Sequence, residues 1–235
     1  MAVPVSPWST APQPWLKVCG LRQPDQAAAV ASLGVEAIGV IAVARSPRWL
    51  PPDQRPALFD AMAQGNPHCR GVLVVADPQD GELPQLGPGL GHHVVQLHGD
   101  ETPQRCGQLR QQLGPNLALW KALRIRSAAD LAHAAHYATV VDGLLLDAWV
   151  PDQLGGTGHR IPTEWLDGFA PALPWWLAGG LTPERVGPAL QALVASPPHG
   201  LDVSSGVEHA PGDKDLDRVA QLVAAVNAVR QDRQS

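Results

Sequence analysis

Short apolar runs recur along the chain, separated by segments of mixed polarity. Eight of these runs are apolar with little alternation, and they cover Leu16–Gly20, Ala37–Ala42, Gly71–Ala76, His93–Gly99, Leu117–Leu123, Thr139–Ala148, Trp175–Gly180 and Gly200–Gly206. Continuous apolarity is typical of strands that are covered on both faces, as in a parallel sheet. The pattern therefore predicts eight buried parallel strands.

Segments with apolar residues at helical spacing lie between these runs. Residues 23–34 carry a proline near their start and end at a glycine, residues 182–195 offer Thr182 as an N-cap followed by Pro183, and residues 216–230 lie near the chain end. Such signals mark helix starts and ends. Strands alternating with helices predict an α/β fold, a single (β/α)8 TIM barrel over residues 16–235.

A doubly wound sheet is the main alternative fold. Its first strand normally leads into a GxGxxG turn, and the stretch "CGLRQP" lacks that motif. Residues 1–15 contain four prolines and no basic segment before an apolar one, unlike a secretory signal. We expect them to form an N-terminal extension outside the barrel, flexible or lying on its surface.

Charge and composition narrow the possible partners. The chain has 17 basic and 22 acidic residues, and Lys and Arg are not concentrated as in a nucleic-acid-binding surface. No apolar run approaches the roughly 18 residues that a membrane span requires. We therefore expect neither nucleic acid nor membrane as a partner. The sequence does not indicate the oligomeric state.

The three cysteines are far apart and form no CxxC pair. This spacing supports neither a zinc site nor a thioredoxin-like motif, and a sparse, odd set of cysteines fits a reducing compartment. We expect a cytoplasmic protein without a metal site.

Enzymes with this fold carry their chemistry at the C-terminal ends of the strands. Cys19 ends the first apolar run and Asp147 ends the sixth, so a thiol and a carboxylate are predicted to share one rim. Such a pair can divide the roles of base and acid if the site shifts their pKa values. Lys17 is expected on the same side of its strand as Cys19. Taken singly, Cys19 could be a small buried core residue, and Asp147 could cap a loop or helix.

Two further stretches indicate a phosphate site. Gly179 and Gly180 end the seventh run, and Ser204, Ser205 and Gly206 end the eighth. Small residues let backbone N–H groups approach an anion, and this fold commonly holds phosphate after its last two strands.

Other polar residues near the strand ends permit two interpretations. Arg48 offers a bidentate fork for a substrate carboxylate, or it is a solvated surface residue. Gln96 and His98, near the end of the fourth run, are either site residues or buried structural ones. The glycine-rich stretch at residues 154–160 is either a closing loop or a plain connector.

These residues lie in ordered motifs: "KVCGL", "RSPRWL", "VQLHGDE", "LLLDA", "GGTGHR", "LAGGLTPERV" and "DVSSGVEHAPGDKD". Together they closely resemble the phosphoribosylanthranilate isomerase family of tryptophan biosynthesis, from about Leu16 to near the C-terminus. The resemblance implies an Amadori rearrangement without a cofactor. Its substrate is a small phosphosugar, N-(5-phosphoribosyl)anthranilate, and its product is 1-(o-carboxyphenylamino)-1-deoxyribulose 5-phosphate.

The resemblance also implies roles for particular residues. Asp147 is the general acid that opens the ribose ring, and Cys19 is the general base that removes the C2' proton, with Gly20 leaving room beside it. Arg48 binds the anthranilate carboxylate. The 5'-phosphate is held by Gly179, Gly180, Ser204, Ser205 and Gly206.

The sequence departs from the family pattern in three places. His159 stands where the glycine-rich loop usually has lysine, and Ala76 stands where the third strand usually has asparagine. The second strand lacks a bulky aromatic residue and a proline, which we expect to reshape the anthranilate pocket or relocate its apolar wall.

Two other classes of protein remain as alternatives. A different phosphosugar barrel, such as an indole-glycerol-phosphate synthase or a ribulose-phosphate epimerase, would share the phosphate loops. The synthase would need catalytic lysines and a glutamate, and the epimerase would need metal-binding residues. A barrel that only binds a metabolite or a protein would leave the Cys19 thiol inert.

Overall fold

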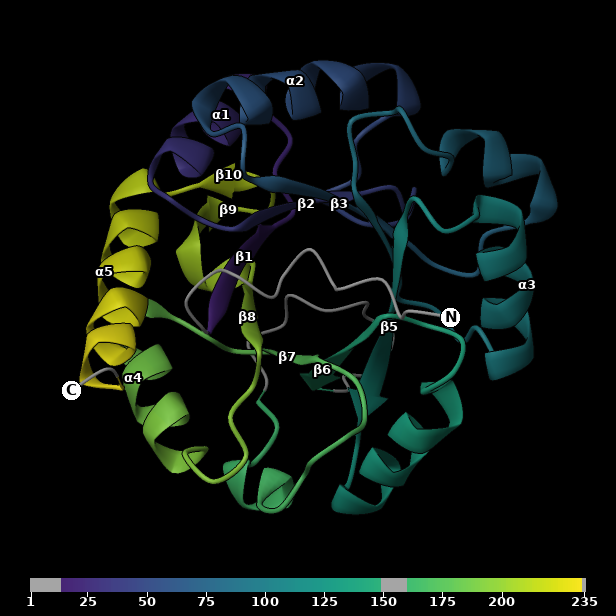
Figure 1. Cartoon of the computed structure of the whole chain (residues 1–235). Coiled ribbons are helices and arrows are strands. Elements are labelled where there is room, and N and C mark those ends of the chain that lie inside the picture. Colours follow the sequence, from purple (N-terminus) through teal and green to yellow (C-terminus); the bar gives the residue numbers. More distant parts are fainter. Residues whose placement is uncertain (1–13, 149–159, 234–235) are drawn as a thin grey trace.

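The computed structural model describes residues 14–148 and 160–233 of the chain. Within these ranges, eight parallel strands form a closed barrel in sequence order (Figure 1). The strands are β1 (Trp15–Cys19), β2 (Ala37–Ile41), β3 (Arg70–Val75), β4 (Val94–Leu97), β5 (Ala118–Ile125), β6 (Gly143–Ala148), β7 (Trp175–Ala178) and β8 (Gly200–Val203). Each of the eight apolar runs overlaps one strand, so the predicted (β/α)8 barrel is confirmed and the doubly wound sheet is excluded.

Helices surround the barrel in Figure 1. The α-helices of the described ranges are α1 (Pro24–Ser32), α2 (Arg55–Gly65), α3 (Pro103–Leu113), α4 (Pro183–Ala192) and α5 (Leu216–Asp232). The connections after β3, β5 and β6 contain the 3-10 segments η2 (Asp80–Gln85), η3 (Ala128–Tyr137) and η4 (Thr163–Leu166) instead. Thr182 and Pro183 begin α4 as predicted, although the Thr182 side chain makes no capping hydrogen bond.

Shorter elements complete the connections near the strand ends. The 3-10 segment η1 (Pro52–Gln54) precedes α2, and η5 (Ser205–Val207) follows β8 directly. After η5, β9 (Glu208–Ala210) and β10 (Asp213–Lys214) form a small antiparallel pair before α5. The stretch after β8 therefore folds back as structured chain and does not run directly into a helix.

Closure of the barrel pairs its first and last strands. In the register of β1 with β8, Lys17 stands opposite Asp202, and Val18 stands opposite Val203. Residues 185 positions apart in sequence thus lie at one level of the barrel. This pairing places a cation and an anion directly beneath the C-terminal mouth.

Three tryptophans fill part of the barrel interior. The rings of Trp120 and Trp176 stack with centroids 4.0 Å apart, and Trp15 lies 6.0 Å from Trp176. Gly200 and Gly143 face these rings, because a Cβ on Gly200 would lie 2.2 Å from Trp176 Nε1 and a Cβ on Gly143 would lie 2.9 Å from the same ring. Large and small residues therefore interdigitate, as expected of a filled barrel.

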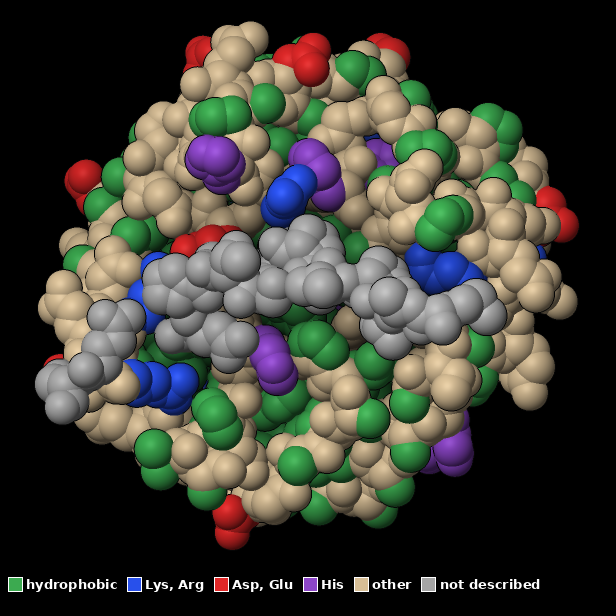
Figure 2. Space-filling view, in the orientation of Figure 1, with side chains coloured by type: hydrophobic (Ala, Val, Ile, Leu, Met, Phe, Trp, Pro, Cys, Tyr) green, Lys and Arg blue, Asp and Glu red, His purple; other side chains and the backbone are tan. Residues whose placement is uncertain are grey.

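A second apolar cluster lies between the strands and the helices. Its members include Leu58 and Met62 of α2 and Val219 and Leu222 of α5, all at most 1% exposed. The face seen in Figure 2 shows apolar side chains scattered among polar ones, with most Asp and Glu side chains at its outer edge. Burial on both faces explains why the strands have continuous apolar sequences.

We predict that Gly200→Ala destabilises the barrel by roughly 1–3 kcal/mol, because the added methyl group overlaps a ring that is already stacked and cannot move away freely. The measurement is the free energy of unfolding from urea titration, followed by circular dichroism.

Gly107→Ala in α3 is the matched control. Its Cβ would meet Val140 Cγ1 at 3.6 Å, an ordinary contact. Replacing glycine inside a helix should raise stability by about 0.5–1 kcal/mol. Equal effects of the two substitutions would contradict the packing argument.

Candidate active site

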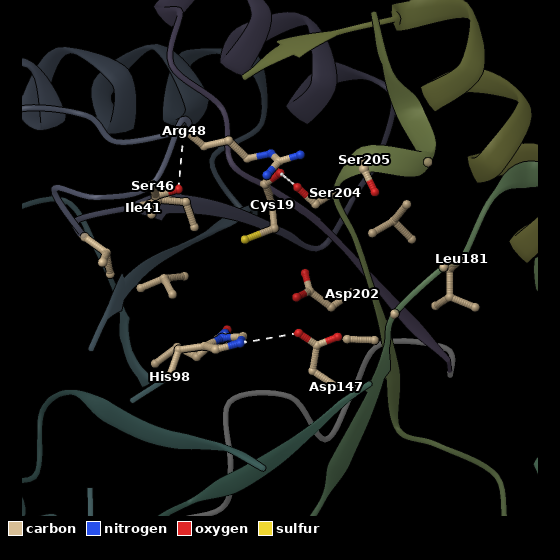
Figure 3. A pocket seen from close by; sticks show the side chains of 18 residues that line it. Cys19, Ile41, Ser46, Arg48, His98, Asp147, Leu181, Asp202, Ser204 and Ser205 are labelled. Atoms are coloured by element: carbon tan, nitrogen blue, oxygen red, sulfur yellow. Dashed lines mark hydrogen bonds and ion pairs between the residues drawn. The ribbon is translucent and has the colours of Figure 1, made fainter. Parts of the chain in front are cut away.

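A pocket at the C-terminal ends of the strands gathers residues from several of them. Cys19 at the end of β1 and Asp147 near the end of β6 both line it. Their side chains face the same space, with Asp202 of β8 between them in the view of Figure 3. Cys19 and Asp147 are each 5% exposed. The structure therefore brings the thiol and the carboxylate to one rim, as the strand positions predict.

The space around the Cys19 thiol is created by a glycine on the neighbouring strand. Gly39 of β2 stands beside Cys19 in the β1–β2 register, and a Cβ there would lie 2.5 Å from Cys19 Sγ. Gly20 makes room for a different side chain, because a Cβ there would lie 2.5 Å from Arg48 Cδ. Its φ of +87° also favours glycine at this position. Gly39 accommodates the thiol, and Gly20 accommodates the arginine.

A buried ion pair lies next to the thiol. Lys17 Nζ donates to Asp202 Oδ1 at 2.9 Å, and the Lys17 side chain is fully buried. Burial lowers the pKa of Lys17, but the charges of Asp202 and Cys19 outweigh it and hold that pKa above its ordinary value. Because Asp202 keeps it protonated, Lys17 remains a cation beside the thiol.

The Cys19 thiol responds to both members of this pair. Burial raises its pKa, Lys17 opposes that rise, and Asp202 adds to it. The net direction is upward, so Cys19 is mainly a neutral thiol in the unliganded protein near pH 7.

Asp147 faces a histidine across the pocket. His98 Nε2 lies 3.4 Å from Asp147 Oδ2, and Gln96 Nε2 lies 3.0 Å from His98 Nδ1 (Figure 3). Gln96 and His98 both line the pocket. Of their two possible interpretations from sequence, the structure supports that of site residues.

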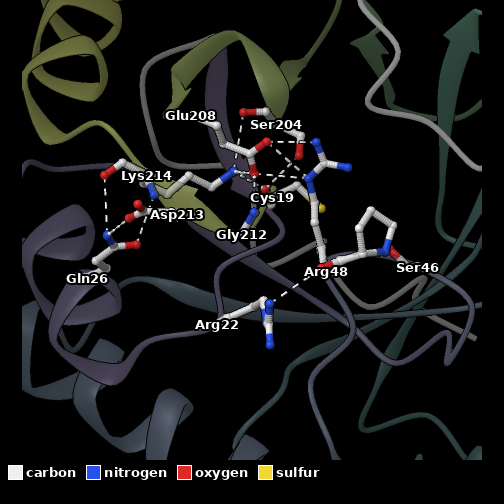
Figure 4. A network of polar contacts seen from close by, with 11 residues as sticks. Cys19, Arg22, Gln26, Ser46, Arg48, Ser204, Glu208, Gly212, Asp213 and Lys214 are labelled. Carbon is white, nitrogen blue, oxygen red and sulfur yellow. Dashed lines mark hydrogen bonds and ion pairs between the residues drawn. The ribbon is translucent and has the colours of Figure 1, made fainter. Parts of the chain in front are cut away.

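Arg48 lies on the opposite side of the mouth, in a network shown in Figure 4. Its Nε donates to both carboxylate oxygens of Glu208, at 3.0 and 3.1 Å, and its Nη2 donates to Oε2 at 2.7 Å. Burial alone would raise the pKa of Glu208, but the Arg48 hydrogen bonds and the Lys214 charge hold it below its ordinary value. Arg48 is thus fixed by Glu208 and still lines the pocket.

Lys214 of β10 joins this network to the backbone beside the thiol. Its Nζ donates to Glu208 Oε1 at 2.7 Å, to the Cys19 carbonyl at 2.6 Å and to the Ser204 carbonyl at 3.3 Å. Burial lowers the pKa of Lys214, and Glu208 opposes that shift. One buried amine therefore links the ends of β1 and β8.

The two loops expected to bind phosphate are in contact. A Cβ on Gly206 would lie 1.9 Å from the Leu181 carbonyl oxygen, so only glycine allows this approach. Gly179 and Gly180 have φ values of +90° and +60°, and Arg185 donates to the Gly180 carbonyl at 3.2 Å. The residues of both loops line the pocket, namely Gly179, Gly180, Ser204, Ser205 and Gly206. The Ser204 hydroxyl, however, donates to the Cys19 carbonyl at 3.0 Å.

The departures from the family pattern have different outcomes. Residues 154–159 of the glycine-rich stretch, including His159, lie outside the described residues, as do residues 1–13 of the N-terminal extension. Ala76 follows β3 and lines a separate pocket beside Arg55. In the second strand and its loop, Ile41 and Val43 line the candidate active site and supply an apolar wall.

Three residues of the site were not singled out as candidates from the sequence. Asp202, Glu208 and Lys214 all lie within the motif "DVSSGVEHAPGDKD", where only its serines and a glycine were expected to function. The position of Asp202 inside an apolar run predicts that its carboxylate is buried. Because charged residues are rarely buried unpaired, this position indicates a charged partner near the mouth of the barrel.

Neither a membrane-spanning helix nor a metal-binding cluster occurs in the described part of the chain. No helix in residues 14–148 and 160–233 is long and apolar enough to cross a membrane. Across the same ranges, no group of three or more His, Cys, Asp or Glu side chains could hold a metal ion.

The fold and the pocket define the class of protein. A closed eight-stranded barrel whose pocket lies at the C-terminal strand ends has the layout of (β/α)8-barrel enzymes. Residues 16–225 match the family described as N-(5'phosphoribosyl)anthranilate (PRA) isomerase. The chain belongs to this isomerase family, which confirms the resemblance in its motifs.

Individual relatives agree with this assignment. The N-(5'-phosphoribosyl)anthranilate isomerase of Synechococcus elongatus is 47% identical over 211 residues, which is 90% of this chain and 95% of the relative. The crystal structure of phosphoribosyl anthranilate isomerase from Thermus thermophilus has a TM-score of 0.77 at 28% identity, covering 92% of this chain and 99% of that one. A further isomerase structure contains reduced 1-(o-carboxyphenylamino)-1-deoxyribulose 5-phosphate, with a TM-score of 0.73 at 24% identity over 91% of this chain and 98% of that one.

We predict that iodoacetamide modifies Cys19 slowly near pH 7 and faster as the pH rises, because only the thiolate reacts and the Cys19 pKa is raised. Asp202→Asn should accelerate modification near pH 7, because it removes a negative charge that raises this pKa. The measurement is a time course of alkylation by peptide mass spectrometry.

Asp232→Asn, at the exposed end of α5, is the charge-matched control and should react like the unmodified chain. A folded Asp202→Asn variant that reacts no faster than this control would show that Asp202 does not govern the thiol.

Proposed function

We propose that this isomerase converts N-(5'-phosphoribosyl)anthranilate into 1-(o-carboxyphenylamino)-1-deoxyribulose 5-phosphate, with Asp147 as general acid and Cys19 as general base. The observation that carries the proposal is the convergence of these two groups on one pocket, together with Arg48 and the loops after β7 and β8. The reaction is a step of tryptophan biosynthesis, and family membership supplies its substrate.

The acid step begins at the ribose ring. Protonation of the ring oxygen by Asp147 lets the C1'–O bond break, while the nitrogen lone pair forms a protonated Schiff base. The carboxylate left on Asp147 faces His98 across 3.4 Å. A nearly buried acid suits this role, because a site that excludes water strengthens the electrostatic interactions of the reacting groups.

The base step uses the charge that the acid step creates. The protonated Schiff base brings a positive charge into the pocket, and together with Lys17 it favours the Cys19 thiolate. The thiolate removes the C2' proton, the electron pair moves toward the nitrogen, and an enolamine results. The enolamine then tautomerises to the ketone, so no cofactor is required in this scheme.

Arg48 and the apolar wall suit the anthranilate group. Glu208 occupies Nε and Nη2 of Arg48, which holds the planar guanidinium in one orientation at the pocket edge. We assign the substrate carboxylate to this guanidinium. Ile41, Val43 and Val74 line the same pocket and provide apolar contacts for the aromatic ring.

The 5'-phosphate is assigned to the paired loops after β7 and β8. Positive φ at Gly179 and Gly180, and the contact between Gly206 and Leu181, give a backbone surface that an anion can approach closely. The Ser205 side chain lies at this end of the pocket (Figure 3). The Ser204 hydroxyl fixes the loop to β1 and leaves phosphate contacts to its neighbours.

We also place the protein in the cytoplasm. Cys19, Cys69 and Cys106 are free and buried, which suits a reducing compartment. The net charge of −5 does not favour nucleic acid, and we propose neither nucleic acid nor a membrane as a partner. The expected partner is the small phosphosugar substrate.

We predict that Cys19→Ala and Asp147→Asn each lower kcat by about 100- to 10,000-fold, the range for loss of a general acid or base. The measurement is the loss of phosphoribosylanthranilate fluorescence, with folding checked by circular dichroism. Cys69→Ala removes a thiol outside the pocket and should remain active. Full turnover in folded Cys19→Ala would contradict the assignment, and an inactive but folded wild type would point to another phosphosugar.

Arg48→Gln should raise KM roughly tenfold or more while changing kcat less, because a charge-assisted bond to the substrate carboxylate is lost. Arg45→Gln, at an exposed position of the same loop, is the control and should leave both constants near their wild-type values. An unchanged KM in Arg48→Gln would remove Arg48 from substrate binding.

A further inference from the structure

We propose that Gln96 and His98 form a positioning pair in which Gln96 fixes one tautomer of His98, so that a neutral Nε2–H stabilises the Asp147 carboxylate as it forms. This inference deepens the proposed function and rests on Asp147 being the general acid. Neither residue is assigned a role in the acid–base scheme above.

The two side chains point into the barrel from one strand. Gln96 lies in β4 and His98 is the first residue after it, so they are two positions apart and share a face. Gln96 is 1% exposed and His98 is 8% exposed. Gln96 Nε2 lies 3.0 Å from His98 Nδ1. His98 Nε2 in turn lies 3.4 Å from Asp147 Oδ2, the contact drawn in Figure 3.

The Gln96 amide nitrogen faces His98 Nδ1, and this orientation favours one histidine tautomer. An amide nitrogen only donates, so His98 Nδ1 must accept and carries no hydrogen. A neutral imidazole then has its single hydrogen on Nε2, the atom that faces Asp147. Gln96 therefore selects the form of His98 that presents a donor to the acid.

Two buried atoms of this pair lack a hydrogen-bond partner. Gln96 Oε1 and His98 Nε2 are both buried and make no hydrogen bond within the described structure. Leaving a buried polar group unpaired is unfavourable, and the reaction can recover this cost by supplying a partner. The nearest acidic oxygen to Nε2 is Asp147 Oδ2, at 3.4 Å, and it becomes a stronger acceptor once Asp147 has given up a proton in the reaction.

A neutral donor suits a general acid better than a charged one. An imidazolium beside Asp147 would favour the ionised carboxylate before the substrate binds, and the proton needed for ring opening would be lost. A neutral N–H favours the anion more weakly in the ground state, and its hydrogen bond strengthens as negative charge develops. The benefit is therefore concentrated in the transition state.

The loop after β4 holds His98 in place. The His98 backbone N–H donates to the Val75 carbonyl at 2.8 Å, and the next residue, Gly99, donates to Glu101 Oε1 at 3.2 Å. Glu101 is anchored by a buried ion pair with Lys121, in which the atoms are 2.8 Å apart. The imidazole is thus oriented from its backbone as well as from Gln96.

The test reverses the tautomer at Gln96. A carboxylate only accepts, so Gln96→Glu should draw a hydrogen onto His98 Nδ1, whereas Gln96→Met removes the bond and selects neither form. Nitrogen-15 NMR of labelled histidine, with His98→Gln to assign the signal, should show Nε2 protonated and Nδ1 bare in the wild type. Gln96→Glu should show Nδ1 protonated, and Gln96→Met should show a mixture.

The kinetic arm uses the same variants. We expect Gln96→Glu to lower kcat by roughly 100-fold with KM changed only a fewfold, and Gln96→Met to lower it less. His98→Gln, whose amide nitrogen can reach the position of Nε2, should retain more of kcat than His98→Leu. If Gln96 and His98 were only structural, the variants would differ in stability, and their kcat values would not follow the tautomer of His98.

Two results would overturn the positioning pair: a wild-type signal with Nδ1 protonated, or a reversed tautomer in Gln96→Glu with an unchanged kcat. Failure of the proposed function is separate, because it appears as full turnover in Asp147→Asn. The NMR assignment of the tautomer does not depend on turnover.

Discussion

Closure of the barrel between β1 and β8 is the constraint on which the site depends. Parallel pairing of these strands places Lys17 of β1 opposite Asp202 of β8 and joins them in a buried ion pair at 2.9 Å. A buried lysine is costly to desolvate, and only a partner at this level of the barrel makes its charge tolerable. Cys19, at the C-terminal end of β1, lies next to this pair, and its raised pKa reflects burial first and then the opposing charges of Lys17 and Asp202.

The stretch after β8 makes polar contacts that connect the C-terminal ends of β1 and β8 with the loop after β2. Glu208 is shared by Arg48 and Lys214, and Lys214 also holds the carbonyl groups of Cys19 and Ser204. The substrate-facing arginine and the base are therefore positioned by one network (Figure 4). Removing one member would leave buried charges unpaired, so a substitution in this network acts on geometry as well as on charge.

Acid and base are held in different electrostatic surroundings. Cys19 lies beside a full ion pair, whereas Asp147 faces an imidazole that its neighbour Gln96 keeps in one neutral form, as we infer. Different surroundings allow two titratable groups in one pocket to take opposite roles, with Asp147 giving a proton and Cys19 accepting one in the proposed scheme. Gly39 contributes by shape alone, because any side chain there would meet the thiol.

The sequence by itself determined the barrel and the candidate acid, base and anion loops. Continuous apolar runs reveal buried parallel strands, and the strand ends mark the mouth, because side-chain direction follows from local periodicity. Only the tertiary structure decided the partners: Asp202 for Lys17, Glu208 for Arg48, and His98 for Asp147. It also showed that Gly39, not Gly20, makes room for the thiol. Contacts between distant strands depend on register and closure, which no local pattern of residues encodes.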